Sequence, residues 1–303
     1  MKQEFYEKLS KIVRKEQILE EELMKKHTTF RIGGPAEYLI LPQTIEEIAD
    51  VIKLCRQEEI PWYIVGNGSN LLVADEGVRG VVIQLLRNFN QIQVEGCQIR
   101  MQAGAQNAAV AKRALDASLT GFEFAAGIPG TIGGAVVMNA GAYGGEMKDI
   151  LKEVTVLDPN GMIRTIPAEE LELGYRTSII ARKGYVVLEA VIVLKTGDPK
   201  EIKAAMDELK EKRVTKQPLE YPSAGSTFKR PEGYFAGKLI MDAGLRGFSV
   251  GGAQISEKHC GFVINKGNAT AKDVTELMDE TKKIVMEKFG VALEPEVKRL
   301  GQF

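Results

Sequence analysis

The spacing of hydrophobic positions changes along the chain, and each spacing predicts a different element. Residues 3–25 place apolar residues at helical intervals among Lys and Glu, which predicts one amphipathic helix. Residues 44–59 repeat this spacing, and Thr44 followed by Glu46 and Glu47 is typical of a capped helix start. Short apolar runs around this helix predict strands at 36–42, 61–66, 80–85 and 98–104.

The second half of the chain alternates strand and helix patterns in the same way. Residues 153–167 predict a hairpin, because the turn signal Pro159-Asn160-Gly161 separates two strand-like runs. A strongly apolar run at 185–194 predicts a further strand, and the charged residues 200–218 predict a helix. The remaining patterns predict a helix at 233–244, a strand at 260–267 and a long amphipathic helix at 271–290.

These patterns predict an α+β protein with more than one domain. The breaks in the pattern favour an N-terminal helix within 1–28, a larger domain at 29–196 and a smaller α+β domain at 197–303.

Composition narrows the classes of function. The chain has 40 basic and 41 acidic residues, so bulk charge does not favour nucleic-acid binding. No apolar run approaches the length of a membrane span and the N-terminus lacks an apolar leader, so we expect a cytoplasmic protein. The three cysteines and two histidines are scattered, which predicts neither a disulfide framework nor a metal site. The sequence leaves the oligomeric state open.

A first glycine-rich loop follows the predicted strand at 61–66. Two glycines in a short loop allow positive φ, so that successive backbone amides can point into one concavity and bind an anion. A tight turn between strands explains the same residues equally well. The loop consists of Gly66, Asn67, Gly68, Ser69 and Asn70.

A second loop, at 121–146, is richer in glycine. Such density suits close backbone approach to a flat ligand or a polyphosphate, although sharp bends in a sheet-rich domain explain some of the glycines. We favour the ligand-binding interpretation. The candidate binding residues are Gly127, Pro129, Gly130, Thr131, Gly133, Gly134, Asn139 and Gly141.

Together the two loops resemble the FAD-binding domain of the vanillyl-alcohol-oxidase superfamily, also called the PCMH-type flavin fold. The resemblance implies that the first loop holds the pyrophosphate of FAD and that the second lines the isoalloxazine and adenine sites. Members with covalent flavin use a His or Cys in these loops, and this chain has neither there. The resemblance therefore implies noncovalent FAD. It also implies that the domain at 29–196 consists of two α+β subdomains, at about 29–85 and 86–196.

Three further segments, at 174–179, 221–231 and 293–301, make the resemblance more specific. In this order behind the two loops, they are similar to the UDP-N-acetylenolpyruvoylglucosamine reductase family over nearly the whole chain. The resemblance implies that Arg176 is the active-site arginine, Ser226 the proton donor and Glu296 the C-terminal catalytic glutamate. Lys229 and Arg230 fall where the family contacts substrate, and His259 falls where some members have a substrate-contacting glutamine.

The family implies a reaction in peptidoglycan precursor synthesis. NADPH reduces FAD, and FAD then reduces the enolpyruvyl ether of a UDP-sugar, with both small molecules using one site in turn. Arg176 and Ser226 are 50 positions apart, which implies the shorter subtype without an inserted tyrosine loop. Two alternatives stay open: another PCMH-type oxidase or dehydrogenase of a small hydroxylated substrate, and a nucleotide-binding module without catalysis.

Overall fold

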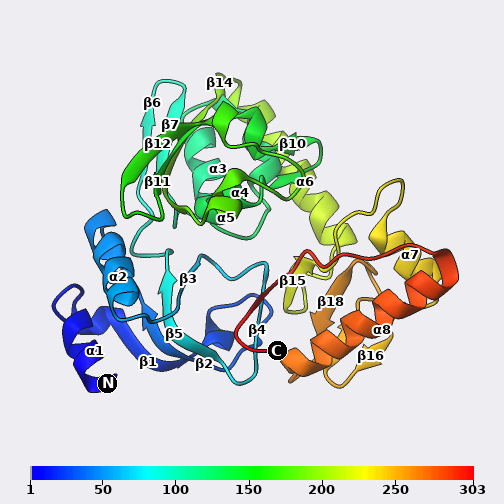
Figure 1. Cartoon of the computed structure of the whole chain (residues 1–303). Coiled ribbons are helices and arrows are strands. Elements are labelled where there is room, and N and C mark those ends of the chain that lie inside the picture. The colour runs from blue at the N-terminus through cyan, green and yellow to red at the C-terminus, as the bar shows by residue number, and fades with distance from the viewer. Residues whose placement is uncertain (1) are drawn as a thin grey trace. The chain divides into compact units, whose positions relative to one another are not determined.

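The computed structural model describes residues 2–303, which group into two compact units. The first unit comprises the described residues up to 19 together with 39–67 and 81–213. The second unit comprises 20–38, 68–80 and 214–303. Figure 1 traces the chain through its elements. Four elements run through the positions where the grouping changes: β1 (Ile18–Leu23), β2 (Pro35–Ile40), β5 (Val78–Gln84) and α6 (Pro199–Lys216).

The first unit contains most of the strands predicted before residue 197. Its remaining elements are α1 (Lys2–Leu9), α2 (Ile45–Gln57), β3 (Trp62–Val65), β6 (Ile92–Glu95), β7 (Gln98–Gln102), α3 (Asn107–Asp116), β8 (Leu119–Thr120), α4 (Ile132–Val137), β9 (Gly141–Ala142), β10 (Gly145–Glu146), β11 (Leu151–Leu157), β12 (Ile163–Pro167), α5 (Ile179–Lys183), β13 (Val186–Val193) and β14 (Lys195–Thr196).

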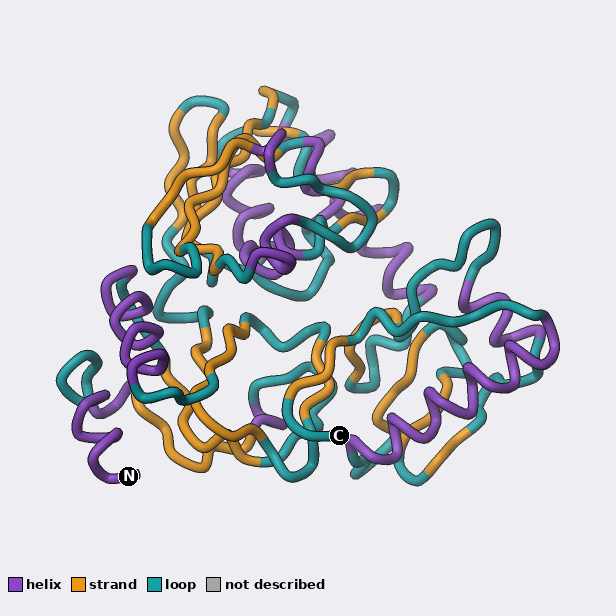
Figure 2. Tube along the Cα trace, viewed as in Figure 1, coloured by secondary structure: helices purple, strands orange, loops and turns teal. Residues whose placement is uncertain are grey.

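An antiparallel sheet of order β12-β11-β13-β7-β6 forms the body of this unit. Strand β13 is apolar along nearly its whole length because it lies in the middle of the sheet, with β11 and β7 on either side. Helices α3, α4 and α5 gather on one face of the sheet (Figure 2), and α4 packs on β13 and β7. The glycine-rich segment 121–146 includes α4, so part of this segment lies on this face of the sheet.

A second sheet has the order β1-β2-β5-β3, and β3 runs parallel to β5. The predicted helix at 44–59 is α2, and the Thr44 hydroxyl accepts a hydrogen bond from the Glu47 amide at 3.2 Å. This confirms the capped start expected from the sequence.

The second unit builds its core from three separate stretches of chain. Phe30, Ile32 and Leu72 pack with apolar residues of the C-terminal segment in one buried cluster. The sheet β15-β18-β17-β16 is antiparallel, and α8 packs on β16 and β17. The elements are β4 (Leu71–Val73), β15 (Ser223–Ser226), α7 (Ala236–Asp242), β16 (Ser249–Val250), β17 (Ala253–Ile255), β18 (Phe262–Asn265), α8 (Ala271–Phe289) and β19 (Lys298–Leu300).

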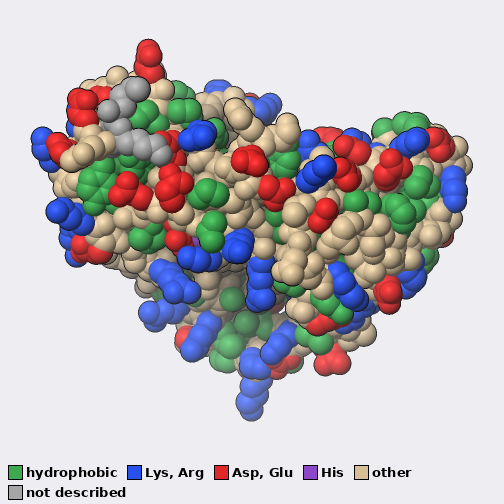
Figure 3. Space-filling model, turned by 90° about the horizontal axis from the view of Figure 1, so that it is seen from below, with side chains coloured by type: hydrophobic (Ala, Val, Ile, Leu, Met, Phe, Trp, Pro, Cys, Tyr) green, Lys and Arg blue, Asp and Glu red, His purple; other side chains and the backbone are tan. Residues whose placement is uncertain are grey.

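On the face drawn in Figure 3, Lys and Arg side chains gather in the lower middle of the view, whereas Asp and Glu side chains are more numerous in its upper half. Within residues 2–303, no helix combines the length and the apolar character that crossing a bilayer requires. The contiguous domain boundaries expected near residues 29, 86 and 197 stay predictions.

The single helix predicted for residues 3–25 is wrong. The helix α1 ends at Leu9, and Ile18–Leu23 is the strand β1 at the edge of its sheet. Three consecutive glutamates in this strand favour a helix by propensity, but pairing with β2 overrides that weak preference. Charged side chains also suit an edge strand, because they oppose pairing with another chain.

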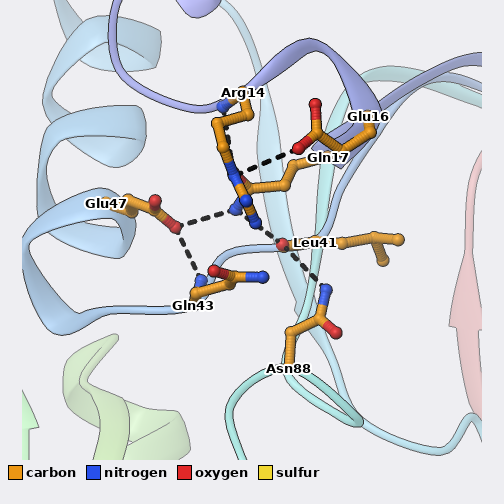
Figure 4. A network of polar contacts seen from close by, with 7 residues as sticks. All are labelled: Arg14, Glu16, Gln17, Leu41, Gln43, Glu47 and Asn88. Atoms are coloured by element: carbon orange, nitrogen blue, oxygen red, sulfur yellow. Dashed lines mark hydrogen bonds and ion pairs between the residues drawn. The ribbon is translucent and has the colours of Figure 1, made fainter.

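Gln17 fixes the entry into this strand (Figure 4). Its side chain is 1% exposed, and its amide donates to the Leu41 carbonyl at 3.0 Å and to Glu47 Oε2 at 2.9 Å. Its Oε1 accepts from the backbone amide of Arg14 at 2.9 Å. A buried polar group needs such partners. The hydrogen bonds of Gln17 therefore hold the chain next to Leu41 and Glu47 at the point where β1 begins.

Helix α8 begins with its first three amides satisfied. The Asp75 carboxylate accepts from the amides of Ala271 at 2.8 Å and Lys272 at 3.0 Å, and the Thr270 hydroxyl accepts from Asp273 at 3.0 Å. Asp75 lies just after β4, so this contact joins the segment of the first glycine loop to the C-terminal helix.

We predict that Asp75→Ala lowers the free energy of unfolding by about 1–2 kcal/mol, because removing this charged acceptor leaves two helix amides without a hydrogen-bond partner in the protein. The shift of the urea midpoint measures the loss. The neighbouring Glu76→Ala makes the same change of charge at a side chain that is likewise exposed but caps no amide of α8, so it should shift the midpoint by much less. Equal losses in the two variants would refute the capping account.

Candidate active site

The first glycine loop is held by close backbone contacts that exclude side chains. Gly68 has φ +62°, and a Cβ at this position would lie 2.2 Å from the His27 carbonyl oxygen and 2.8 Å from Thr28 Cα. The Gly68 carbonyl accepts from the Thr29 amide at 3.3 Å. Only glycine combines this φ with this approach, so the loop is built around Gly68.

The remaining polar groups of the loop leave backbone donors available. The Gly66 carbonyl accepts from Gln84 Nε2 at 3.0 Å, which turns that oxygen toward the protein. In the part of the chain that the structure describes, the amides of Asn67 and Gly68 donate no hydrogen bond. Two adjacent amides without acceptors in a glycine turn suit a phosphate oxygen.

The second glycine loop meets the first at Thr131. A Cβ on Gly66 would lie 2.4 Å from Thr131 Oγ1, and Thr131 directly precedes α4. Gly133 and Gly141 are also crowded, since their Cβ atoms would lie 3.0 Å from Ala103 Cβ and 2.7 Å from Glu146 Cβ. Close packing within the protein therefore explains why these three positions are occupied by glycine, and no ligand is needed for that explanation.

Gly134 is different, because nothing in the protein requires a glycine there. It is exposed, and its Cβ would have one neighbour within 4 Å, Thr131 Oγ1 at 3.9 Å. A glycine inside a helix costs about 1 kcal/mol relative to alanine. An exposed glycine that packing does not explain fits a surface that a flat ligand must approach, as FAD would.

The other candidates of this loop fix its course. Gly130 has φ +136°, and its carbonyl accepts from the Asn107 amide at 3.2 Å. Pro129 precedes it, and its ring restricts the backbone φ at that position. Gly127 lies against Arg213, with 2.9 Å between its would-be Cβ and Arg213 Nε.

Asn139 lies at the end of α4 and is 1% exposed. Its amide nitrogen donates to Glu146 Oε2 at 2.9 Å and to the Gly174 carbonyl at 3.1 Å, and its Oδ1 accepts from the Lys148 amide at 2.9 Å. All three bonds are made within the protein, and one of them reaches the segment that contains Arg176.

Arg176 lies in a tight turn closed by Gly174 and Thr177. Each of these two residues donates its amide to the other's carbonyl, at 3.1 and 3.3 Å. Arg176 has φ +54°, a left-handed conformation that costs a non-glycine residue on the order of 1 kcal/mol or more. Its guanidinium lies 5.2 Å from the centre of the Tyr175 ring. The strained backbone indicates that the surrounding contacts determine where this arginine lies.

Ser226 and Glu296 belong to neighbouring segments of the second unit. Ser226 ends β15 and is exposed, and a register shift between Ser223 and Ser226 turns the strand where Gly225 has φ +76°. The Glu296 amide donates to the Thr227 carbonyl at 2.8 Å. The Glu296 carbonyl in turn accepts from Asn70 Nδ2 at 3.2 Å.

The two predicted substrate contacts are both engaged with neighbouring side chains. Lys229 forms an ion pair with Glu294, and its amide donates to the Glu294 carbonyl at 2.8 Å. The Arg230 guanidinium lies 4.4 Å from the centre of the Phe235 ring, which is 60% exposed. His259 is partly buried, and burial lowers its pKa.

Sequence reasoning missed Arg213 and Tyr143. The Arg213 guanidinium lies 5.9 Å from the centre of the Tyr143 ring and against Gly127, and burial lowers its pKa from the ordinary value. The available signal was weak, because Arg213 stands among other charged residues of α6 and resembles them in sequence. Its burial beside a glycine of the second loop makes it a further candidate.

Comparison with known proteins shows the family. A family model described as "FAD binding domain" matches residues 36–167, and one described as "UDP-N-acetylenolpyruvoylglucosamine reductase, C-terminal domain" matches residues 217–300. The reductase of this name from Lachnoclostridium phytofermentans is 55% identical over 300 residues, which cover 98% of this chain and 97% of the relative. The chain belongs to the UDP-N-acetylenolpyruvoylglucosamine reductase family. The Clostridioides difficile reductase is 53% identical, with 99% of each chain covered.

Solved structures agree with this assignment. The reductase of this family from Thermus caldophilus has a TM-score of 0.81 and 39% identity, and the match covers 93% of this chain and 99% of that one. p-Cresol methylhydroxylase, a PCMH-type protein, has a TM-score of 0.51 at 15% identity and shares the fold alone. The α+β PCMH-type fold is thus confirmed, and the family is favoured over the alternative of another oxidase or dehydrogenase.

We predict that Gly68→Val weakens FAD binding at least about tenfold, because a β-branched residue resists positive φ and collides with the His27 carbonyl. Fluorescence titration of the apoprotein with FAD measures the affinity. The matched control is Gly96→Val, where φ is +59° and a Cβ would meet nothing within 4 Å. If both variants bind FAD equally well, this loop is only a turn.

Proposed function

We propose that this chain reduces UDP-N-acetylglucosamine enolpyruvate to UDP-N-acetylmuramate, with NADPH as reductant, in peptidoglycan precursor synthesis. The family assignment supports the reaction class. The cytoplasm is the proposed location, because NADPH and nucleotide sugars are found there.

One observation carries the proposal most directly. The segment of Ser226, the segment of Glu296 and the loop residue Asn70 are joined by consecutive hydrogen bonds of 2.8 and 3.2 Å. Three motifs that are far apart in sequence thus meet in one unit. A proton donor, a carboxylate and a cofactor loop are the parts that such a reduction needs.

FAD would be held by the two glycine loops. The amides of Asn67 and Gly68 would donate to its pyrophosphate, and the open surface at Gly134 would admit its flat part. When bound, FAD accepts hydride from NADPH and supplies hydride to the enolpyruvyl double bond. No His or Cys occurs in either loop, which supports noncovalent binding.

Arg176 would bind the carboxylate of the enolpyruvyl group. Reduction of the double bond at its terminal carbon leaves negative charge on the α carbon and the adjoining carboxylate. A guanidinium stays charged and binds a carboxylate through two parallel hydrogen bonds, so it stabilises this charge. A fixed arginine does so better than a mobile one, because no reorganisation is required during the reaction.

Ser226 would deliver the proton that completes the product. Its hydroxyl is exposed at the end of β15, where a substrate can reach it, and its backbone is fixed by the register shift of that strand. Glu296 would contact the substrate as the C-terminal catalytic glutamate that the family resemblance implies. Lys229 and Arg230 would contact the remaining anionic parts of the substrate.

We predict that acid precipitation of the purified yellow protein releases its flavin into the supernatant. Noncovalent FAD leaves when the fold is lost, whereas a covalent bond would keep the colour in the pellet. The absorbance of both fractions near the flavin band measures the outcome. Yellow pellets would contradict the proposal of noncovalent binding.

We predict that Ser226→Ala separates the two halves of the reaction. Reduction of FAD by NADPH needs no protonation of carbon and should proceed nearly normally. Reoxidation by the enolpyruvyl substrate should slow by about 10²–10⁴-fold, the usual contribution of a positioned general acid. Stopped-flow absorbance follows both halves, because reduction bleaches the flavin band.

Ser226→Cys is the matched control for this prediction, since a thiol is the stronger acid and should restore part of the second half. Equal slowing of both halves would show that Ser226 is structural or lines the shared binding site. No slowing of either half would assign the proton to another group, with Glu296 as the first candidate.

A further inference from the structure

Asn139 ends helix α4 with a backbone arrangement that glycine serves equally well. Its amide donates to the Val136 carbonyl at 3.1 Å, the Ala140 amide donates to the Ala135 carbonyl at 2.8 Å, and Asn139 itself has φ +41°. This is the hydrogen-bond pattern of a Schellman motif, in which the left-handed position is most often glycine and sometimes asparagine. The backbone alone therefore does not explain the asparagine.

The side chain of Asn139 has its own role in the protein. It is 1% exposed, and it makes three hydrogen bonds of 2.9 to 3.1 Å, to Glu146, Gly174 and Lys148. Both amide hydrogens are used by acceptors on different segments. A side chain whose donors are both committed to the protein is poorly suited to bind a cofactor as well.

The bond to the Gly174 carbonyl reaches the turn that presents Arg176. Gly174 and Thr177 close this turn with reciprocal backbone bonds, and Arg176 lies between them in the left-handed conformation. A strained backbone persists only where surrounding contacts determine it. A second tie comes from Ser178, which is fully buried and whose hydroxyl donates to the Val137 carbonyl at 2.8 Å. Asn139 and Ser178 thus fasten the arginine turn to the end of α4.

We infer that Asn139 is a positioning residue for Arg176. Its amide fixes the turn relative to α4, the helix that carries Gly133 and Gly134 of the second glycine loop. Together with Ser178, Asn139 thereby sets where the Arg176 turn lies relative to the surface at Gly134, which is proposed to take the flavin. The inference rests on the proposed function, in which Arg176 binds the substrate carboxylate.

The decisive variant is Asn139→Gly, because glycine keeps the left-handed helix end and removes the three side-chain bonds. In the holoenzyme we expect FAD reduction by NADPH to stay within about twofold of the wild type. Flavin reoxidation by the enolpyruvyl substrate should slow about 10- to 100-fold, the scale expected when a catalytic group is misplaced by about an ångström. The matched control is Asn268→Gly, an exposed asparagine at φ +54°, which should change neither half.

A double-mutant cycle with Arg176→Ala separates positioning from other roles. If Asn139 acts through Arg176, adding Asn139→Gly to Arg176→Ala slows reoxidation by less than about twofold further. Independent, multiplying effects in the cycle would overturn the inference. So would a parallel loss of FAD affinity and of both half-reactions in Asn139→Gly, which would mark a cofactor-binding role.

The same cycle distinguishes failure of the inference from failure of the proposed function. If Arg176→Ala alone leaves reoxidation unchanged, the role proposed for Arg176 is wrong and the inference falls with it. If Arg176→Ala is slow but the two effects multiply, only the inference about Asn139 falls. Should Asn139→Gly not accumulate as folded protein, Asn139→Asp takes its place, because it keeps the shape and replaces the amide donors with carboxylate oxygens.

Discussion

The parallel pairing of β19 with β4 is the contact on which the arrangement of Asn70, Ser226 and Glu296 within the second unit depends. Lys298 pairs with Leu71, and its amide donates to the Asn70 carbonyl at 2.9 Å. This register brings the Glu296 carbonyl to the Asn70 side chain, 3.2 Å away. Leu72 of the same short strand is fully buried in the core, and Asp75 just beyond it caps α8. Backbone pairing of three residues thus connects the first glycine loop, which is proposed to bind FAD, with the C-terminal strand and with α8.

Positive φ separates two kinds of position in this protein. At Gly68 the backbone approaches a carbonyl so closely that no side chain fits, and glycine is required there because it has no Cβ. Asn139 and Arg176 adopt positive φ with side chains present, against a conformational cost. At such positions the side chain must contribute enough to offset the strain. Asn139 does so with three hydrogen bonds, and the role proposed for Arg176 gives the corresponding reason there.

Periodicity and end signals predicted the long elements, and they failed where tertiary pairing outweighs propensity. Helices α2 and α8 and the hairpin of β11 and β12 follow from apolar spacing, from Thr44 and from the turn at Gly161. The strand β1 could not be predicted, because its glutamates look helical until β2 lies beside them. The candidate site residues were predicted by resemblance to a family and stay predictions, whereas the bond from Asn139 to Gly174 spans 35 positions and leaves no local pattern.

Ser226 and Arg176, two of the residues proposed to act on the substrate, are each held by a neighbour that does not contact it. Thr227 is buried and anchors the exposed Ser226, since its amide donates to Gly261, its hydroxyl accepts from Val263 and its carbonyl accepts from Glu296. Asn139 stands in the same relation to Arg176. The polar atoms of a group that contacts substrate are not available for the hydrogen bonds that would fix its own position. The fold assigns that task to buried polar residues beside it, and this explains why Thr227 and Asn139 are both buried and hydrogen-bonded to several neighbouring segments.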